Sequence, residues 1–169
     1  MIAEYGVEKA EEWATGLVSN LARRPQGNDR AQVKGIYEGL CDIAIINNYY
    51  FGKLKYSEDP VQREWAKSMR LTFPNQEEGD RGAHINISGG GVAKHSKNKE
   101  SAIKLLEFLS NSKSQKMYSE INFEYPVNVK VEPSEELVSW GNFREDKISI
   151  GKIAQLSIDA QKIIDRVGW

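Results

Sequence analysis

The sequence predicts an α/β protein in which helices alternate with short strands. Apolar residues recur at helical spacing near both ends of the chain. Short β-branched runs between the helical segments have the composition of strands buried on both faces. Turn residues such as Pro25–Asp29 separate the periodic segments. The sequence therefore favours helices packed on a largely parallel or mixed sheet.

The first forty residues contain two predicted helices. Apolar residues follow helical spacing over residues 7–21, and Pro25 closes this segment. Asn28 or Asp29 caps a second helix, because a short polar side chain accepts hydrogen bonds from the free N–H groups of the first turn. Gly39 ends that helix.

A predicted strand leads into two adjacent tyrosines. The apolar run of residues 42–46 indicates a buried strand, and Asn47–Tyr50 follows it directly. Asp59–Pro60 is a typical helix start and predicts a helix to Met69. Residues 71–73 are the second strand-like stretch.

The remaining chain is predicted to be mainly helical. Residues 75–82 are an acidic, glycine-containing loop, and the alternating residues 84–87 indicate a strand before the glycine run 89–91. Residues 124–127 are extended because of Pro126. Helices are predicted at 98–109, 112–121, 133–140 (one turn) and 150–167.

Composition excludes several classes of protein. The 169 residues are 40% hydrophobic and 28% charged, with a mean hydropathy of −0.57. The net charge of −1 gives no field that attracts nucleic acid, and the longest apolar run, Ile43–Ile46, excludes membrane insertion. A single cysteine, Cys41, excludes a disulfide framework. Met1–Tyr5 runs directly into the first helix without a signal peptide, which suits a cytoplasmic protein or part of a longer chain.

Tyr49 and Tyr50 are the sharpest candidates for a ligand site. They follow a predicted buried strand, where open α/β sheets place ligand crevices, and Asn47 or Asn48 would start a helix there. Phenol has a pKa near 10, but a trivalent cation favours the deprotonated donor. Two phenolates would therefore suit ferric iron. The alternative is structural, with one ring in the core and the other on the surface.

The other motifs are better explained by structural roles than by metal binding, phosphate binding or catalysis. His84 and His95 lack metal-ligand spacing, and the glycine run 89–91 before Lys94 lacks both phosphate-loop patterns. The acidic run Glu77–Asp80 suits a solvated loop. Cys41 has no basic neighbour, and no serine lies in a nucleophile elbow.

At the tyrosine pair the sequence resembles the periplasmic ferric-iron-binding proteins of bacterial ABC importers. The resemblance covers nearly the whole chain in dispersed matches that keep one order. They are Glu12–Asn20, Pro25–Asp29, Cys41–Ala44 with the tyrosines, Phe73–Gln76, His84–Gly89, Ala102–Leu109, Glu124–Val127 and Gly168–Trp169.

The resemblance implies a type II periplasmic-binding-protein fold, of which this chain is the C-terminal half of a two-lobed, hinged architecture. Family iron ligands fall on Tyr49 and Tyr50. Asn47 and, with a less certain match, Asn28 would support the metal or an accompanying anion such as carbonate, phosphate or citrate. Tyr5 does not fall on a family ligand position.

The resemblance also implies an organisation in three parts. Residues 1–75 form part of the C-terminal lobe with the tyrosine pair, 76–130 cross over and contribute to the N-terminal lobe, and 131–169 pack on the lobes. The implied function is to bind ferric iron in the periplasm and deliver it to an ABC permease, without catalysis, nucleic acid or membrane insertion.

Family ligands from the first half of a typical member have no counterpart here. Two phenolates fill only part of a six-coordinate shell, so we expect weak iron binding by this chain alone. Apolar surface left uncovered would favour oligomerisation. The rival functions are binding of another anion or small polar solute, and a stand-alone α/β enzyme or interaction domain.

Overall fold

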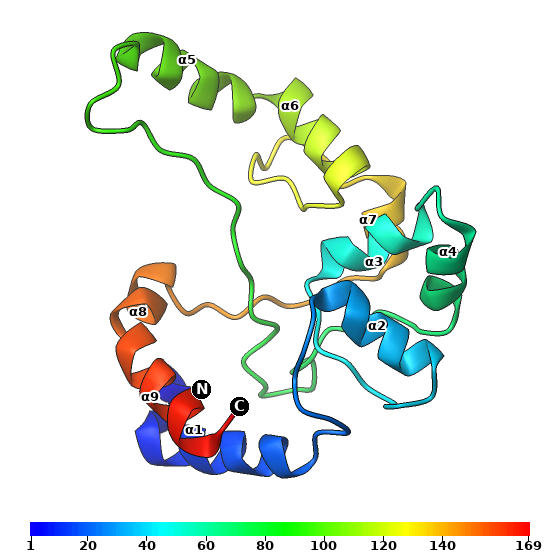
Figure 1. Ribbon diagram of the computed structural model, residues 1–169. Coiled ribbons are helices and arrows are strands. Elements are labelled where there is room, and N and C mark those ends of the chain that lie inside the picture. Colours follow the sequence, from blue (N-terminus) through cyan, green and yellow to red (C-terminus); the bar gives the residue numbers. More distant parts are fainter.

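The computed structural model describes all residues, 1–169, and arranges their helices in two groups joined by long irregular segments (Figure 1). The helices in chain order are α1 (Ile2–Ser19), α2 (Asp29–Tyr37), α3 (Asn48–Lys55), α4 (Pro60–Lys67), α5 (Lys99–Leu109), α6 (Ser112–Met117), the π-helical turn η1 (Tyr118–Asn122), α7 (Glu135–Ser139), α8 (Ile150–Gln155) and α9 (Ser157–Val167).

The two ends of the chain form the first group, called here the α1–α9 group. Helices α1 and α9 pack side by side, blue against red in Figure 1, with α8 leading into α9. Ala10, Ala14 and Ile163 are buried between them. Arg166 adds a bidentate ion pair with Glu11, at 2.5 and 2.8 Å. The first and last predicted helices thus become one packed unit.

The second group is built around α2, α3 and α4 and is called here the α2–α4 group. Its core contains Val33, Leu54 and Ala66, one from each helix. The segments η1 and α7 lie against α3, and Figure 1 shows α6 and α5 extending away from this group. The tyrosine pair belongs to this group because it opens α3.

Helix starts follow the capping residues predicted from sequence. Asp59 accepts a hydrogen bond from the N–H of Val61 at 2.9 Å and begins α4 with Pro60 in its first turn. Asn28 caps α2, and Gly39 follows its end with a φ of 71°. These signals are local, so the sequence alone predicts them correctly.

Four other predicted helices differ in detail. Asn111, and not Ser112, caps α6 with its side chain, and the helix passes into η1. The predicted long final helix is divided at Leu156, whose ψ of 1° separates α8 from α9. The first helix is interrupted at Gly6, whose φ of 81° lies outside the helical region. No residue of α5 is buried, so its predicted apolar face lies open.

The predicted strands do not form a sheet within this chain. Residues 42–46, 71–73 and 84–87 have no ladder, and the only pairing is an isolated parallel bridge between Ala83 and Glu145. A strand is stable only when neighbouring strands satisfy its N–H and C=O groups, and none lies beside these segments. The expectation that 42–46 is buried on both faces is therefore wrong for this chain.

The single bridge joins the segment between α4 and α5 to the segment between α7 and α8. The N–H of Ala83 donates to the carbonyl of Arg144, and the N–H of Asp146 donates to the carbonyl of Ala83, both at 2.8 Å. Gly82 has a φ of 96°, and a Cβ there would lie 2.6 Å from the Arg144 oxygen. The Arg144 guanidinium also donates to the carbonyls of Glu77 and Asp80.

Candidate functional site

The tyrosine pair lies in the first turn of α3, directly after the irregular segment 42–46. Asn47 is the cap residue of α3 in extended conformation, and Tyr49 and Tyr50 are both half-buried. Their ring centroids are 4.4 Å apart, and the ring planes meet at 33°. The alternative in which one ring is buried and the other lies separately on the surface does not hold, because the two rings are in contact.

Asp29 brings the starts of α2 and α3 together. One oxygen of its carboxylate accepts hydrogen bonds from the backbone N–H of Asn47 at 2.7 Å and from its side-chain amide at 3.2 Å. Asn28, the residue before Asp29, caps α2 by accepting from the N–H of Ala31 at 3.2 Å. The two asparagines predicted from the resemblance are therefore placed at neighbouring helix N-termini, which favour negative charge.

The surroundings keep Tyr49 protonated at ordinary pH. Its pKa is raised to about 12, first by hydrogen bonding with Tyr50 and next by burial, with smaller contributions from the charges of Tyr50, Asp29 and Glu124. A phenol in this state does not bind a cation until it loses its proton. A hard trivalent ion supplies the charge that makes this loss favourable.

Two cations lie over the tyrosine rings. The Nζ atom of Lys53 is 4.9 Å from the ring centroid of Tyr49, and the guanidinium carbon of Arg30 is 6.0 Å from that of Tyr50. Lys53 follows Tyr49 by one helical turn, so its position is a consequence of helix geometry. Cations beside the pair would offset part of the negative charge of two phenolates.

The far end of α3 is anchored by Glu136 of α7. Its carboxylate accepts hydrogen bonds from Lys55 at 2.7 Å, Tyr56 at 2.6 Å and Trp140 at 2.8 Å, and its side chain is 11% exposed. Burial would raise the pKa of Glu136, but the hydrogen bonds from Lys55, Tyr56 and Trp140 outweigh it and leave the pKa lowered. Sequence reasoning missed Glu136, since about eighty residues separate it from its partners on α3.

The other sequence candidates gather no further ligands around the tyrosines. No three His, Cys, Asp or Glu side chains lie close enough to hold a metal ion, so His84, His95 and the acidic run 77–80 do not form such a site. The side chain of Asp80 instead accepts from the N–H of Glu77 at 3.1 Å. No helix of the chain combines the length and the apolar character that crossing a bilayer requires.

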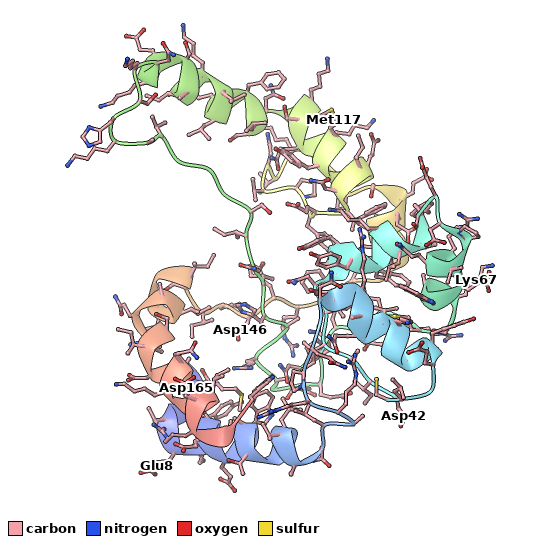
Figure 2. All side chains as sticks on the ribbon, in the orientation of Figure 1. Glu8, Asp42, Lys67, Met117, Asp146 and Asp165 are labelled. Carbon is pink, nitrogen blue, oxygen red and sulfur yellow. The ribbon has the colours of Figure 1, made fainter.

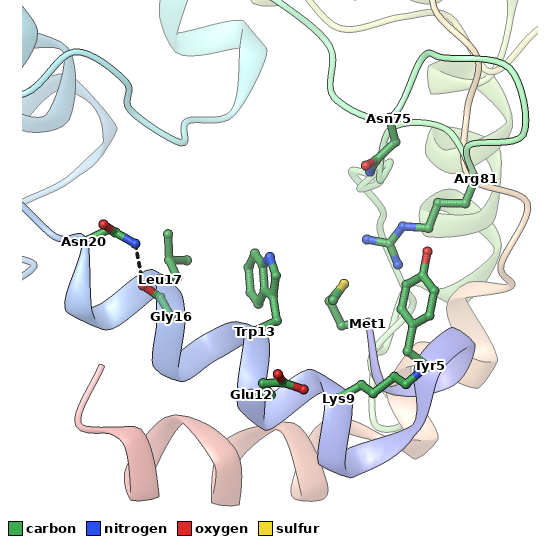
Figure 3. Close-up of a pocket in the computed structure, with 10 residues that line it drawn as sticks. All are labelled: Met1, Tyr5, Lys9, Glu12, Trp13, Gly16, Leu17, Asn20, Asn75 and Arg81. Carbon is green, nitrogen blue, oxygen red and sulfur yellow. Dashed lines mark hydrogen bonds between the residues drawn. The ribbon is translucent and has the colours of Figure 1, made fainter.

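A hollow lies elsewhere in the molecule, along α1 (Figure 3). It is an open groove of about 780 Å³ with aromatic and charged side chains on its walls. Tyr5 lies against the guanidinium of Arg81, with 5.9 Å between its ring centroid and the guanidinium carbon, and Trp13 stands further along the helix. Neither Tyr49 nor Tyr50 lines this groove, so Tyr5 belongs to a different part of the molecule.

Comparison with known proteins gives a consistent set of relatives, although no family model matches the chain. Iron uptake protein A1 of Synechocystis sp. is 41% identical over 169 residues, all of this chain and 46% of that protein. The major ferric iron-binding protein of Neisseria meningitidis is 28% identical over 163 residues, which are 96% of this chain and 46% of that protein. The chain thus spans about half the length of these relatives.

A solved structure is similar to this chain over nearly its whole length. The Trichodesmium IdiA protein in complex with iron and citrate superposes with a TM-score of 0.92 at 45% identity, over 99% of this chain and 52% of that chain. The predicted fold class is thereby confirmed: the chain has part of the type II periplasmic-binding fold.

Proposed function

We propose, from the premise that this chain is homologous to the C-terminal portion of the periplasmic ferric-iron-binding proteins, that it supplies part of a ferric-iron site. Tyr49 and Tyr50 are the proposed ligands through their phenolate oxygens. The observation that carries the proposal is the contact of the two rings, 4.4 Å apart, at the start of α3. The role is binding and delivery, with no catalysed reaction.

An anion is proposed to share the site with iron. Asn47 and Asn28 lie at the N-termini of α3 and α2, which are bridged by Asp29, and helix N-termini favour anions. Carbonate, phosphate or citrate would fill coordination positions that two phenolates leave open. One relative is described in complex with iron and citrate, which supports this choice of anion class.

The test is titration of the 169-residue chain with ferric citrate. We expect a visible tyrosinate-to-iron charge-transfer band that is lost when Tyr49→Phe and Tyr50→Phe are combined. Tyr37→Phe is the matched control, because Tyr37 is an exposed tyrosine at the end of α2. Absence of the band in the unaltered chain at saturating ferric citrate would refute the proposal.

Binding by this chain alone is proposed to be weak. The chain itself supplies only two phenolate ligands to a six-coordinate ferric shell, and both tyrosines keep partial exposure to water. A tight complex of one ferric ion per chain would contradict this part of the proposal. The partner that receives the iron is proposed to be an ABC permease, and the compartment the periplasm, both by homology.

Binding of another anion or small polar solute is the second candidate. The paired helix N-termini beside Arg30 and Lys53 favour it, because they attract negative charge even without a metal. Calorimetric titration with phosphate or citrate separates the two functions. Binding that is unchanged in the double phenylalanine variant, together with no charge-transfer band, would favour the solute over iron.

A further inference from the structure

The net charge of −1 conceals an uneven distribution of charge along the chain. The 169 residues include 23 basic and 24 acidic side chains, and six of the basic but only two of the acidic ones lie in residues 94–116. This stretch, called here the basic arm, therefore has a net charge of +4, and the rest of the chain has a net charge of −5. Such asymmetry between parts of a chain indicates interaction with a charged surface.

The basic arm forms one end of the molecule. It consists of the loop before α5, α5 itself and α6, which extend away from the α2–α4 group in Figure 1. Apart from α6, which follows it, no helix lies beside α5 in Figure 2. The six basic residues are all exposed lysines: Lys94, Lys97, Lys99, Lys104, Lys113 and Lys116. The positive charge of this stretch is thus gathered at one end of the molecule.

Five of the six lysines have no charged partner within the chain. Only Lys116 forms an ion pair, with Glu120 at 3.8 Å, and both side chains of that pair are exposed. The ion pairs of the chain otherwise lie on other segments. The charge of the basic arm is therefore available to an anion outside the chain.

The acidic remainder of the chain does not cancel the field of the basic arm. At physiological ionic strength, exposed charges more than about 8 Å apart are largely screened from each other. Helix α5, with 11 residues, is by itself about 16 Å long. A negatively charged surface in contact with the arm is therefore attracted mainly by lysines. Repulsion of the acidic remainder turns this end of the molecule toward the surface.

We propose that the basic arm binds the surface of an anionic lipid bilayer. Clusters of roughly four to eight basic residues bind such bilayers electrostatically. The arm contains no arginine, whose planar fork recognises a defined carboxylate or phosphate group, whereas the lysine ammonium is a point charge on a flexible stem. A set of lysines alone suits a plane of diffuse charge better than a defined acidic site on a protein or a nucleic acid.

This binding goes beyond the proposed iron site and does not depend on it. It would hold the molecule beside the membrane that contains the proposed permease. The test is cosedimentation of the 169-residue chain with vesicles of phosphatidylcholine alone, or with vesicles in which about a third of the lipid is phosphatidylglycerol. We expect binding to the anionic vesicles only. It should be lost in about 0.5 M sodium chloride, because salt shortens the range of the attraction.

Two triple variants make the test specific. Lys94→Glu, Lys97→Glu and Lys99→Glu combined should weaken binding to the anionic vesicles at least about tenfold. These positions lie before α5 or in its first turn, where negative charge stabilises a helix, so α5 should remain folded. The control combines Lys9→Glu, Lys147→Glu and Lys152→Glu, which makes the same change of charge at exposed lysines outside the arm. It should bind nearly as well as the unaltered chain, and circular dichroism checks that both variants keep their helices.

Several outcomes would overturn the proposal. They are equal binding to both kinds of vesicle, equal weakening by the two triple variants, and no binding to anionic vesicles. Binding to poly-glutamate in place of the vesicles would make an acidic polypeptide the partner and would also overturn it. The variant with Tyr49→Phe and Tyr50→Phe should bind the vesicles like the unaltered chain, so a failure of lipid binding and a failure of iron binding are observed separately.

Discussion

At the scale of residues, the contact that holds the two tyrosines close together also raises the pKa of Tyr49, which opposes binding of a cation. The rings of Tyr49 and Tyr50 are in contact without metal, and the surroundings, hydrogen bonding with Tyr50 first and burial second, raise the pKa of Tyr49 to about 12. A metal bound at the pair, as proposed, would have to displace the proton of Tyr49, and the raised pKa makes that loss less favourable. If the pair binds a metal as proposed, a cation of high charge is needed to make the loss of the Tyr49 proton favourable.

Proton release should accompany iron binding. If both phenols ionise, the unaltered chain releases two protons per ferric ion, and Tyr49→Phe releases one fewer. Because the raised pKa keeps Tyr49 protonated in the free chain, the apparent affinity for ferric iron should increase as the pH rises. The measurement is titration in weakly buffered solution at constant pH, with Tyr37→Phe as control. Equal proton release by the unaltered chain and Tyr49→Phe would contradict the assignment.

At the scale of elements, α3 is held at both ends. Its start is joined to α2 through Asp29 and Asn47, and its end is joined to α7 through Glu136. Between these ends Gly52 lies against the ring of Phe123, which also stacks on Tyr56 with 5.5 Å between centroids. The orientation of the tyrosines therefore depends on packing along the whole helix.

Removal of the Glu136 carboxylate should destabilise the chain. Glu136→Ala leaves Lys55, Tyr56 and Trp140 without their shared acceptor, and we expect a loss of about 1–2 kcal/mol in the free energy of unfolding. Chemical denaturation measures this. Glu135→Ala, on the exposed side of the same helix, should change stability by a few tenths of a kcal/mol.

The effect of Glu136 should also depend on pH. Its folded-state pKa is lowered below the ordinary value of about 4.3, so its contribution is present above that value. The contribution is lost as the pH falls through the lowered pKa. The stability difference between the unaltered chain and Glu136→Gln should accordingly shrink under acidic conditions. A difference that grows toward acid pH would contradict this account.

Glycine-to-alanine changes in two helices should have opposite effects. A Cβ at Gly52 would lie 2.3 Å from the Phe123 ring, so Gly52→Ala should cost about 1–3 kcal/mol of stability. Gly16 in α1 has open space at the same position, and Gly16→Ala should stabilise the chain by about 0.5–1 kcal/mol. Thermal unfolding compares the two. Equal effects would show that the contact with Phe123 is not close.

At the scale of the whole molecule, the two helix groups have separate cores. Ala10, Ala14 and Ile163 form one core, whereas Val33, Leu54 and Ala66 form the other. Irregular segments connect the groups, and the bridge at Ala83 and Glu145 ties two of those segments to each other. Such an arrangement favours local unfolding over a single cooperative transition.

Core substitutions should therefore act on one group each. Leu54→Ala should lower the free energy of opening of the α2–α4 group by about 2–5 kcal/mol, or unfold this group entirely. Hydrogen exchange in α1 and α9 should stay unchanged. Ile163→Ala should do the reverse. Residue-resolved hydrogen exchange measures both. A uniform increase in exchange across the chain for either variant would indicate one cooperative unit.

The sequence by itself determined the features that depend on neighbours in the chain. Capping by Asn28 and Asp59, the end of α2 at Gly39 and the tyrosine pair at the start of α3 all follow from local hydrogen bonding and backbone preference. The adjacency of the two tyrosines is a property of the sequence, whereas the contact of their rings is seen only in the structure. The proposed roles of Asn47 and Asn28 in supporting a metal or an anion come from the family resemblance, because no rule on residue spacing predicts them.

Tertiary structure alone decided what depends on distant residues. Glu136 reaches α3 from eighty residues away, and α1 packs on α9 from the opposite end of the chain. Segment 42–46 has the composition of a buried strand, yet Ile43 lies open to solvent. A pattern of apolar residues shows only that a segment would gain free energy if its side chains were buried. Burial itself requires a partner surface, and the structure of this chain contains none for that segment.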